Sequence, residues 1–510
     1  MQPKPAGILG ESEERSSALH SNAAAIRAVT AAVERTLGPK GLDTMLVDRY
    51  GDVLVTNAGV TILEKMEVSH PAAIMLIKVA QAQQEAVGDG TTTATLLANA
   101  LIQAGVEQID AGVPVAQVIL GIKSAVQQAL ILLAEHSLTV SLEDTDTLEQ
   151  IALVAGREHR DIAKLVVEAA TLVGNSKLSA DNWRLADTII AKAGMDNAVF
   201  LGVTVEKERL SSDLPSLMTS PKLLFFEDAL EPEEVRAEAQ GTESGYAHYL
   251  ELQKEFLSSL AKLIDSGVEV IFCERGISPI AEEVLGEAGI IAIPRIPAKS
   301  LRQGAEHCAT KPIKRGFLKR SVLDITKVQG TAKQIAFCTE LGQIRISGGA
   351  GVTSATLLVG AATVELVAER ERIAGDAASS LQAALRGGIV PGGGATELAL
   401  ASELSKLRGK QKGMSVYGWD CVISALKRPI AQIVQNAGFN PLEKVEMAHA
   451  AQSTSQSNVW GIDCDSGEVC DMLKAGIVDP TEVKSHALRT AAEITEAILQ
   501  IGRASCRERV

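Results

Sequence analysis

The chain has 510 residues, of which 46% are apolar and 22% are charged, and its formal net charge is −14. This length is too great for one ordinary hydrophobic core and fits roughly three domains of common size, while the composition excludes an intrinsically disordered chain. The acidic charge and an aromatic share of 3% argue against a nucleic-acid partner, because phosphate contacts need cations and base stacking needs aromatic rings.

Nothing in the sequence predicts a membrane span or a secretion signal. No apolar run reaches the roughly 20 residues that a span requires, and the N-terminal stretch MQPKPAGILGESEERSS has no apolar signal core. We therefore predict a cytoplasmic protein without membrane contact. The seven cysteines are scattered, which favours reduced structural thiols; a metal site is the alternative, although Cys464 and Cys470 lack the Cys-x-x-Cys spacing.

The first predicted helix follows Ser21, which can cap it, and has apolar residues at spacings of three and four: Ile26, Val29, Val33 and Leu37. The sequence LGPKG at 37–41 ends this helix, since proline and glycine do not continue it. The stretches TMLVD and DVLVTN then predict a short hairpin that turns near Arg49 to Gly51.

Further helices are predicted at about 71–86, directly after residue 93, and over the amphipathic stretch 115–133. The middle of the chain then alternates between strand-like runs (DNAVFLGVTVEKE, KLLFFED, VEVIFCE) and helix-like stretches, which indicates an α/β unit. From Thr353 the pattern is helical again to the end, apart from a break at 386–397. Two predominantly helical ends therefore flank an α/β middle.

An acid-rich stretch at 231–245, EPEEVRAEAQGTESG, precedes a helix-like stretch at 246–264 in this middle part. On composition it is either a solvated loop or the tip of a projecting arm. The apolar stripe of the following helix is typical of a buried face; its members are Tyr249, Leu252, Phe256, Leu260 and Leu263.

The hexad GDGTTT, Gly88 to Thr93, is the first candidate for a binding site. Its glycines let the backbone approach a ligand, and hydroxyls with the first amides of the next helix suit a phosphate. Asp89 is its only carboxylate, and Mg²⁺ bound to a nucleotide often needs only one or two protein carboxylates. The alternative is a capped helix start, in which Thr91 or Thr92 satisfies unpaired amides.

Two other glycine-rich breaks accompany the hexad, and neither is decisive alone. TLGPKG at 36–41 is either a ligand loop or a plain helix end, and VPGGGATE at 390–397 is either a ligand loop or an interdomain hinge. The chain contains no Gly-x-x-x-x-Gly-Lys-Ser/Thr loop, and no Gly-x-Gly-x-x-Gly sequence opens a βαβ unit.

Six stretches in this order resemble the chaperonin family along nearly the whole chain: TLGPKG, GDVLVTNAGVTIL, HPAA, GDGTTTAT, VPGGGATE and GIDCDSGEV. The pattern MLVD…GDVLVTN…HPAA resembles the group II branch, which includes the thermosome and the eukaryotic cytosolic chaperonins. VDPTEV at 478–483 is more similar to the bacterial group I branch. The sequence is thus identified as a divergent, group II-like chaperonin of bacterial or archaeal type.

The resemblance implies a multidomain subunit with the chaperonin fold. An α-rich equatorial ATPase domain would comprise 1–140 and 389–510, and a small α/β intermediate domain would comprise 141–208 and 352–388. The α/β apical, substrate-facing domain would be 209–351, with a helical lid protrusion at about 229–258.

The resemblance also implies which residues hold ATP and Mg²⁺. Asp89 would bind the metal and contribute to catalysis, and Asp376, in RIAGDAASS, would orient the attacking water. The nucleotide would contact the residues Thr36, Leu37, Gly38, Pro39, Gly88, Asp89, Gly90, Thr91, Thr92, Thr93, Gly392, Gly393, Gly394 and Asp479.

The implied function is ATP-dependent enclosure of unfolded client proteins. The resemblance implies a homo-oligomeric double ring with about eight subunits per ring, closed by its built-in lid without a separate co-chaperonin. Two other functions stay open at this point. One is a holdase or scaffold with little ATP turnover, and the other is a metabolic ATP-dependent enzyme, for which no base-containing acceptor site is evident.

Three departures from the family pattern bear on activity. Ala58 stands in NAG where relatives have Asn-Asp-Gly, and its methyl group cannot bind metal or polarise water. Arg157 stands where group II members place a nucleotide-sensing lysine, and a planar guanidinium is not equivalent to an ammonium. The basic ending GRASCRERV, 502–510, replaces the usual tail or is a cloning remnant.

Domain movement requires hinges, for which irregular and glycine-rich segments are candidates. We expect one hinge at Gly387 and Gly388, with 137–144 beside it on the other connection, and an apical hinge at GGAG, 348–351. Ordinary loops are the alternative for all three.

Overall fold

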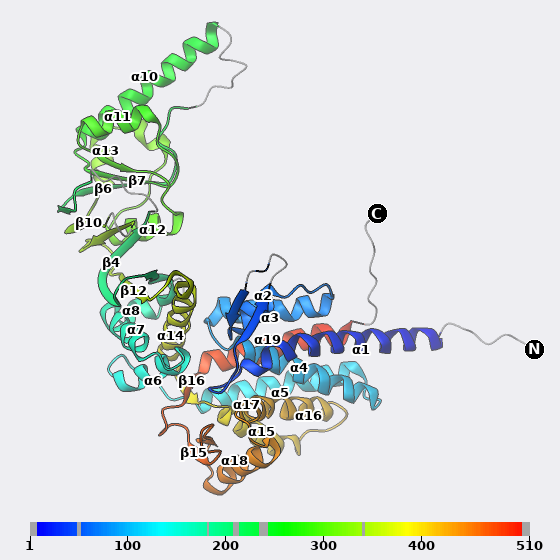
Figure 1. Ribbon diagram of the computed structural model, residues 1–510. Coiled ribbons are helices and arrows are strands. Elements are labelled where there is room, and N and C mark those ends of the chain that lie inside the picture. The colour runs from blue at the N-terminus through cyan, green and yellow to red at the C-terminus, as the bar shows by residue number, and fades with distance from the viewer. Residues whose placement is uncertain are drawn as a thin grey trace, which may run out of the picture.

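The computed structural model describes residues 8–47, 51, 53–180, 183–207, 214–233, 243–338 and 342–501. Figure 1 shows an elongated, bent molecule in which both helical ends of the chain form one lobe and the middle of the chain extends away from it. Five clusters of buried apolar side chains divide this architecture into a helical part, a connecting part and a distal part.

The helical part combines the first and last segments of the chain. Its N-terminal elements are α1 (Ile8–Val33), η1 (Glu34–Thr36), β1 (Thr44–Val47), β2 (Val53–Thr56), α2 (Gly59–Lys65), α3 (Pro71–Val87), α4 (Thr91–Asp110) and α5 (Val115–Glu135). Its C-terminal elements are β13 (Ile389–Pro391), α15 (Ala395–Arg408), α16 (Val416–Leu426), α17 (Arg428–Asn436), α18 (Pro441–Ser455), β14 (Trp460–Ile462), β15 (Val469–Asp471), β16 (Val478–Pro480) and α19 (Thr481–Gln500).

Helix α5 has the length and composition of a membrane span, contrary to the expectation that no such segment exists. It is nevertheless a core helix in this structure, because it packs against α16 and α19 and its inner residues belong to the largest apolar cluster. Glycines allow the close crossing of α5 and α16: a Cβ on Gly121 would lie 1.9 Å from the backbone oxygen of Ser415. The helix length is therefore used for packing inside the lobe.

The connecting part contains α6 (Thr145–Ala155), α7 (Arg160–Val173), α8 (Asn175–Leu178), η2 (Leu185–Thr188), β3 (Ile189–Ala193), β4 (Ala198–Glu206), β12 (Ala355–Ala361), η4 (Val364–Leu366) and α14 (Val367–Gly387). Helix α14 packs against α6 and α7, and its apolar face forms the centre of one core cluster. The two chain connections to the helical part run together, since the Ser137 hydroxyl donates to the backbone oxygen of Gly387 at 2.8 Å. The structure thus brings two of the predicted hinge segments side by side.

The distal part contains β5 (Leu217–Thr219), β6 (Lys222–Phe226), α10 (Glu243–Asp265), β7 (Val270–Cys273), α11 (Pro279–Glu287), β8 (Ile291–Ile293), α12 (Ala298–His307), η3 (Arg315–Lys319), α13 (Val322–Lys327), β9 (Gly330–Thr331), β10 (Gln334–Cys338) and β11 (Gln343–Ser347). Strands β6, β7 and β8 are parallel, which confirms the predicted α/β unit. Strand β9 adds antiparallel to β6 at the edge of this sheet, whereas β5, β10 and β11 join a six-stranded sheet in the order β3-β12-β4-β11-β10-β5. Within that sheet β4 pairs first with β12 and then with β11, so a single strand crosses from the connecting part into the distal part.

Helix α10 confirms the predicted helix at 246–264, and it projects beyond the distal part in Figure 1. Its C-terminal half is anchored through the buried residues Phe256, Leu260 and Leu263, whereas Tyr246 and Leu250 nearer its start are exposed. This favours the arm over a plain loop. Most of the acid-rich tip, 234–242, lies outside the described residues.

Several sequence predictions differ from the structure in detail. Ser21 is no N-cap, because α1 already begins at Ile8. The stretch after Thr353 is first the strand β12 and becomes helical only later, since the run Ala355–Ala361 is buried between β3 and β4. The hairpin β1–β2 is confirmed, with Arg49 of its predicted turn outside the described residues. The predicted apical hinge GGAG is pinned to the end of α12, where Gly349 N–H donates to His307 Nε2 at 3.1 Å.

Candidate functional site

The hexad Gly88–Thr93, called the phosphate loop below, lies between α3 and α4. Gly88 and Gly90 both adopt left-handed conformations (φ 73° and 77°), which glycine accepts without steric cost. Helix α4 starts at Thr91 and has Gly90 as its N-cap, with no side-chain hydrogen bond to its first amides. The alternative of a helix start capped by threonine is therefore wrong, and these amides are available to an anion.

The first glycine loop, 36–41, is held against α17. Asn436 Nδ2 donates to the backbone oxygen of Leu37 at 2.8 Å, while Gly38 and Pro39 remain exposed and Gly38 has φ 85°. Thr36 is buried, and its hydroxyl donates to a backbone carbonyl of the preceding turn at 2.8 Å. The Thr36 hydroxyl proton is thus engaged inside the chain, and a ligand would meet the exposed glycine and proline of this loop.

The third glycine loop connects β13 to α15 and passes beside β16. A Cβ on Gly392 would lie 3.2 Å from Asp479 Oδ1, so backbone and carboxylate are neighbours. Gly393 and Gly394 have positive φ angles of 61° and 79°, and a Cβ on Gly394 would lie 2.7 Å from Ile430 of α17. Both residues therefore favour glycine for conformation, and Gly394 requires it for space as well.

Shared contacts bring these predicted site segments together. Helix α17 touches both the first loop, through Asn436, and the third loop, through Ile430. Gln83 Nε2 donates to the backbone oxygen of Asp89 at 2.8 Å and to that of Val483, near Asp479, at 3.1 Å. Three segments that are far apart in the sequence thus form one contiguous region.

Asp376 reaches this region from α14, in the connecting part. Ser380, one helical turn after it, donates its hydroxyl to Asp89 Oδ2 at 2.8 Å. Burial raises the pKa of Asp376 to about 7, with Arg372 opposing this shift and Asp89 adding to it. Burial also raises the pKa of Asp89, while its hydrogen bonds from Ser380 and Gly90 work in the opposite direction. The two predicted catalytic carboxylates therefore influence each other.

Arginine side chains balance the two carboxylates. Arg372 Nη1 donates to Asp376 Oδ2 at 2.6 Å, and the same guanidinium binds Glu369 with both Nε and Nη2. Burial and the neighbouring Arg372 lower the pKa of Arg157, whose charge in turn acts on Asp376 and Asp89. Arg157 has φ 53°, an uncommon conformation for a residue with a side chain.

Ala58 lies at the edge of the same region. It is buried, and a Cβ on its neighbour Gly59 would lie 2.4 Å from Thr92 Oγ1 of the phosphate loop. The chain has a methyl group here, so position 58 supplies no carboxylate beside Asp89.

Lys484 stabilises the wall of the site formed by Asp479, and sequence reasoning missed it. Its ammonium lies 2.7 Å from Asp479 Oδ2 and 2.7 Å from Glu397 Oε1, and it is almost fully buried. Burial lowers the pKa of Lys484, but the two carboxylates outweigh that effect and raise it above its usual value. Only the fold brings these three residues together.

Ser380 and Arg372 were also missed, although the sequence held a signal for both. They lie four residues after and four residues before Asp376, and residues at this spacing share one face of a helix. Which face α14 presents to the phosphate loop could not be read from the chain.

The polar groups around Asp89 fit a magnesium ion that is bound together with a nucleotide. Within the described ranges, no group of three or more His, Cys, Asp or Glu side chains could hold a metal alone. Asp89 supplies one carboxylate beside free helix amides, and phosphate oxygens and water would complete the six oxygens that Mg²⁺ prefers.

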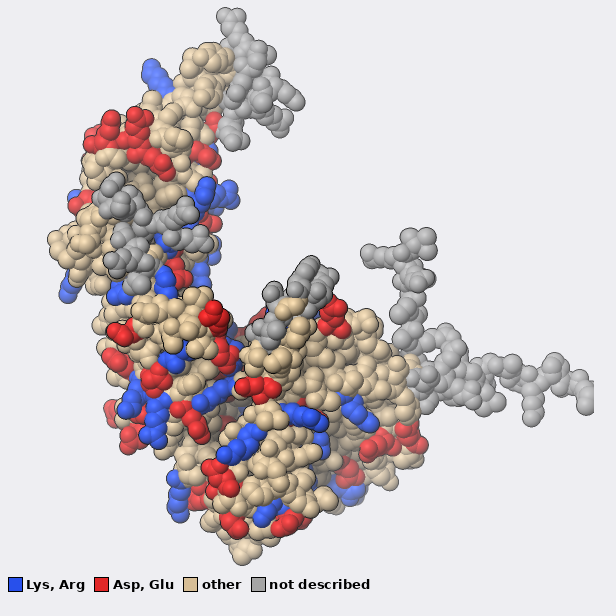
Figure 2. Space-filling view, viewed as in Figure 1, with Lys and Arg blue, Asp and Glu red and all other residues tan. Residues whose placement is uncertain are grey.

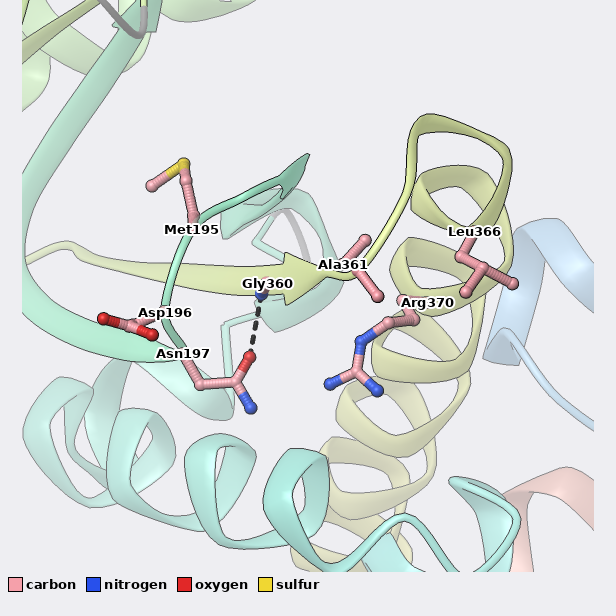
Figure 3. Close-up of a pocket in the computed structure, with 8 residues that line it drawn as sticks. Met195, Asp196, Asn197, Gly360, Ala361, Leu366 and Arg370 are labelled. Atoms are coloured by element: carbon pink, nitrogen blue, oxygen red, sulfur yellow. Dashed lines mark hydrogen bonds between the residues drawn. The ribbon is translucent and has the colours of Figure 1, made fainter.

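One open pocket lies elsewhere and contains none of the predicted site residues. It lies at the turn between β3 and β4, beside the end of β12 and the start of α14 (Figure 3). Asn197 accepts from Gly360 N–H at 2.8 Å and donates to Asp161 Oδ2 at 2.9 Å, and Arg370 also binds Asp161. These contacts fasten secondary structure elements to one another, so the pocket is a surface feature of the connecting part.

Charge on the molecular surface is mixed. On the face shown in Figure 2, acidic and basic side chains are interspersed, and no continuous basic track appears.

Comparison with known proteins identifies relatives along nearly the whole length. The TCP-1/cpn60 chaperonin family matches residues 29–503. Thermosome subunit alpha of Archaeoglobus fulgidus is 31% identical, covering 98% of this chain and 94% of the relative, and a thermosome subunit of Methanocaldococcus jannaschii is 30% identical, covering 96% and 92%.

A solved structure, the crystal structure of a group III chaperonin in the open state, matches with a TM-score of 0.86 and 43% identity. The match covers 97% of this chain and 100% of that one. It confirms the multidomain chaperonin fold and the group II-like resemblance seen in the sequence. The chain belongs to the TCP-1/cpn60 chaperonin family.

Proposed function

We propose that this chain is the subunit of an ATP-dependent chaperonin that encloses unfolded proteins and hydrolyses ATP as it closes. The observation that carries this proposal is the hydrogen bond between Ser380 and Asp89. Through this bond the helix that carries Asp376 lies against the phosphate loop that carries Asp89. Two carboxylates from parts with separate hydrophobic cores therefore lie close enough to influence each other's charge.

The proposed domain assignment follows the three parts of the structure. Residues 1–140 and 389–510 form the equatorial ATP-binding domain, 141–208 and 352–388 the intermediate domain, and 209–351 the apical domain. The protrusion at about 229–258 is the built-in lid, supported by the projecting half of α10. A separate co-chaperonin is not needed in this arrangement.

In the proposed nucleotide site, the phosphate loop amides bind the phosphates and Asp89 holds Mg²⁺. The magnesium ion, when bound, neutralises phosphate charge and links the nucleotide to Asp89. The backbone of Thr36 to Pro39 borders the phosphates, and Gly392 to Gly394 with Asp479 borders the ribose and base. These glycines bring backbone close enough for such contacts.

Asp376 acts as the acceptor that orients water for attack on the terminal phosphate. Phosphoryl transfer depends on positioning and charge stabilisation more than on covalent chemistry. A pKa of about 7 means that this carboxylate titrates near neutral pH, and Arg372 favours its charged form. Hydrolysis is therefore conditional on α14 lying against the phosphate loop.

The proposed assembly is a cytoplasmic, homo-oligomeric double ring with about eight subunits per ring. Hairpin β1–β2 supports self-association, because the hairpin and the segment just before it expose large apolar side chains: Leu42, Met45, Val47 and Val55. A two-stranded hairpin with such a surface is stabilised when another chain covers it. Unfolded proteins are the proposed clients, and neither membrane nor nucleic acid is a partner.

The holdase alternative has less support. Ala58 removes one carboxylate, but Asp89 and Asp376 both remain and lie on the same region. A chain used only for holding would not need a carboxylate from a second core at the phosphate loop. A metabolic kinase would require an acceptor pocket beside this loop, and the pocket in Figure 3 lies in another part of the molecule.

The test combines particle shape with function. Electron micrographs of the purified protein should show end-on rings, and a denatured client should regain activity with ATP but not without it. Asp376→Asn should keep the rings and the nucleotide binding while losing most hydrolysis, a reduction of about 10²–10⁴-fold. Monomeric particles that ignore ATP would refute the proposal.

A further inference from the structure

Ser380 uses its hydroxyl in an unusual way for a helical serine. Serines inside helices commonly donate to the backbone oxygen four residues earlier, as Ser405 does to Ala401 at 2.7 Å and Ser455 does to Ala451 at 2.7 Å. Ser380 is completely buried, and its hydroxyl donates instead to Asp89 Oδ2 at 2.8 Å. A buried hydroxyl directed at a carboxylate of another core indicates more than local helix structure.

The Asp89 carboxylate is fixed from both sides. Its Oδ1 accepts from Gly90 N–H at 2.6 Å, and its Oδ2 accepts from Ser380. Each carboxylate oxygen has a second acceptor position, so both hydrogen bonds leave room for a cation. The backbone of the same residue is held by Gln83 at 2.8 Å, and the side chain therefore has little freedom to rotate.

The neighbouring residue shows how closely α14 lies on the loop. A Cβ on Gly88 would lie 2.3 Å from Ser379 Oγ and 2.5 Å from Ser379 Cβ. The helix thus contacts the loop at two successive positions, Ser379 by packing and Ser380 by hydrogen bonding. The helix and the loop are therefore in direct contact at this point.

We propose that Ser380 is a positioning residue for the metal-binding carboxylate. It presets the Asp89 side chain for Mg²⁺, and it fixes that carboxylate relative to Asp376, which lies one helical turn earlier on α14. This inference rests on the proposed function of Asp89 as the metal ligand. Groups that orient a ligand to a metal without touching the metal commonly change its affinity by about 10–100-fold when they are removed.

The test measures metal affinity separately from nucleotide affinity. Mn²⁺ serves as a spectroscopic substitute for Mg²⁺, and its binding to the assembled protein is followed by electron paramagnetic resonance in the presence of ADP. ADP binding without metal is measured by calorimetry. We compare the parent protein with Ser380→Ala, with the near-isosteric Ser380→Cys, whose thiol is a weak donor, and with the matched control Ser405→Ala.

Ser380→Ala should weaken Mn²⁺ binding by about tenfold or more and leave metal-free ADP affinity within about twofold. Ser380→Cys should show a clear loss as well, which keeps the test valid if the alanine variant folds poorly. Ser405→Ala should behave like the parent, since its hydroxyl only bonds within its own helix. A merely structural serine would lower both affinities together or neither.

Two outcomes would overturn the proposal, and they differ in what else they affect. If the parent binds Mn²⁺ with ADP and both Ser380 variants bind it equally well, Ser380 has no positioning role and the proposed function stands. If the parent itself binds no Mn²⁺ with ADP, the metal role of Asp89 fails, and both this inference and the proposed function fail with it.

Discussion

The ion pair between Arg372 and Asp376 predicts how hydrolysis depends on pH. Arg372 Nη1 lies 2.6 Å from Asp376 Oδ2, and both side chains are mostly buried, with 19% and 17% exposed. Burial raises the pKa of Asp376 to about 7, and the guanidinium holds it below the value that burial alone would give. Replacing Arg372 with methionine removes this charge while keeping an apolar side chain of similar reach.

The size of the effect follows from the titration of one carboxylate. An adjacent arginine lowers the pKa of an aspartate by about 1–3 units, so Arg372→Met should raise the pKa of Asp376 from about 7 to about 8 or above. The negative charge of Glu369, no longer paired, acts in the same direction. At pH 7 the charged fraction then falls from about one half to about one tenth, which predicts about fivefold slower hydrolysis.

The sign of the pH dependence distinguishes this cause from a general loss of structure. Asp376 accepts from water only as a carboxylate, so the rate should rise with pH through its pKa. The two rates should therefore differ most below the raised pKa and converge as the pH rises toward about 9, where the variant carboxylate also becomes charged. Single-turnover hydrolysis measured from about pH 6 to about pH 9 tests this, because it reports the chemical step rather than product release.

Arg370→Met is the matched control. Arg370 lies on the same helix and also binds an aspartate, but its partner is Asp161, away from the phosphate loop. Its rate profile should overlay that of the parent. If the Arg372→Met profile also overlays the parent profile, the carboxylate that titrates during hydrolysis is not Asp376, and the reasoning is refuted.

Three further predictions follow from contacts around the phosphate loop and the hairpin. Ala58→Asp should accelerate single-turnover hydrolysis by about tenfold or more, because it restores a carboxylate beside the loop; equal rates would reject the idea that Ala58 slows turnover. Gly88→Ala should lower the melting temperature and reduce the free energy of unfolding by about 2–5 kcal/mol, because of its left-handed backbone and its clash with Ser379. Adding Ser379→Gly should restore only the part of this stability that the clash removed. Met45→Glu, at a side chain that is 65% exposed, should dissociate the assembly in size-exclusion chromatography without loss of helical circular dichroism.

Much of the fold could be predicted because the spacing of apolar residues in many segments matches the helix or strand that the segment forms. Hairpin β1–β2, helix α10 and the parallel strands β6 and β7 all lie where alternation or helical spacing indicated them. The strand β12 was missed because it is buried on both sides and reads as a plain apolar run, which periodicity cannot separate from a helix. Short elements such as α2, with seven residues, carry too few apolar repeats to be seen.

The candidate site was predictable only in part. Glycine loops can be read from sequence because their backbone demands are local, and Asp89 stands out as the only carboxylate in its loop. Asp376 was chosen through the family resemblance, since an aspartate on a helix is ordinarily a surface residue. The roles of Ser380 and Lys484 depend on contacts that only the fold creates. Ser380 bonds Asp89, which is hundreds of residues away, and Lys484 belongs to a buried triad that no local pattern indicates.

The position of the proposed catalytic groups depends on the opposite face of their helix. Arg372, Asp376 and Ser380 follow one another at four-residue spacing, so they form one stripe along α14. Neighbouring residues of the same helix pack into the core of the connecting part; they are Ile373, Ala374, Ala377, Ala378 and Leu381. Since a packed core resists displacement by even one methylene group, the stripe moves only when this whole core moves. The chemistry at the phosphate loop is thereby linked to the connecting part as a rigid unit, and strand β4, which pairs with both β12 and β11, carries that link onward to the distal part.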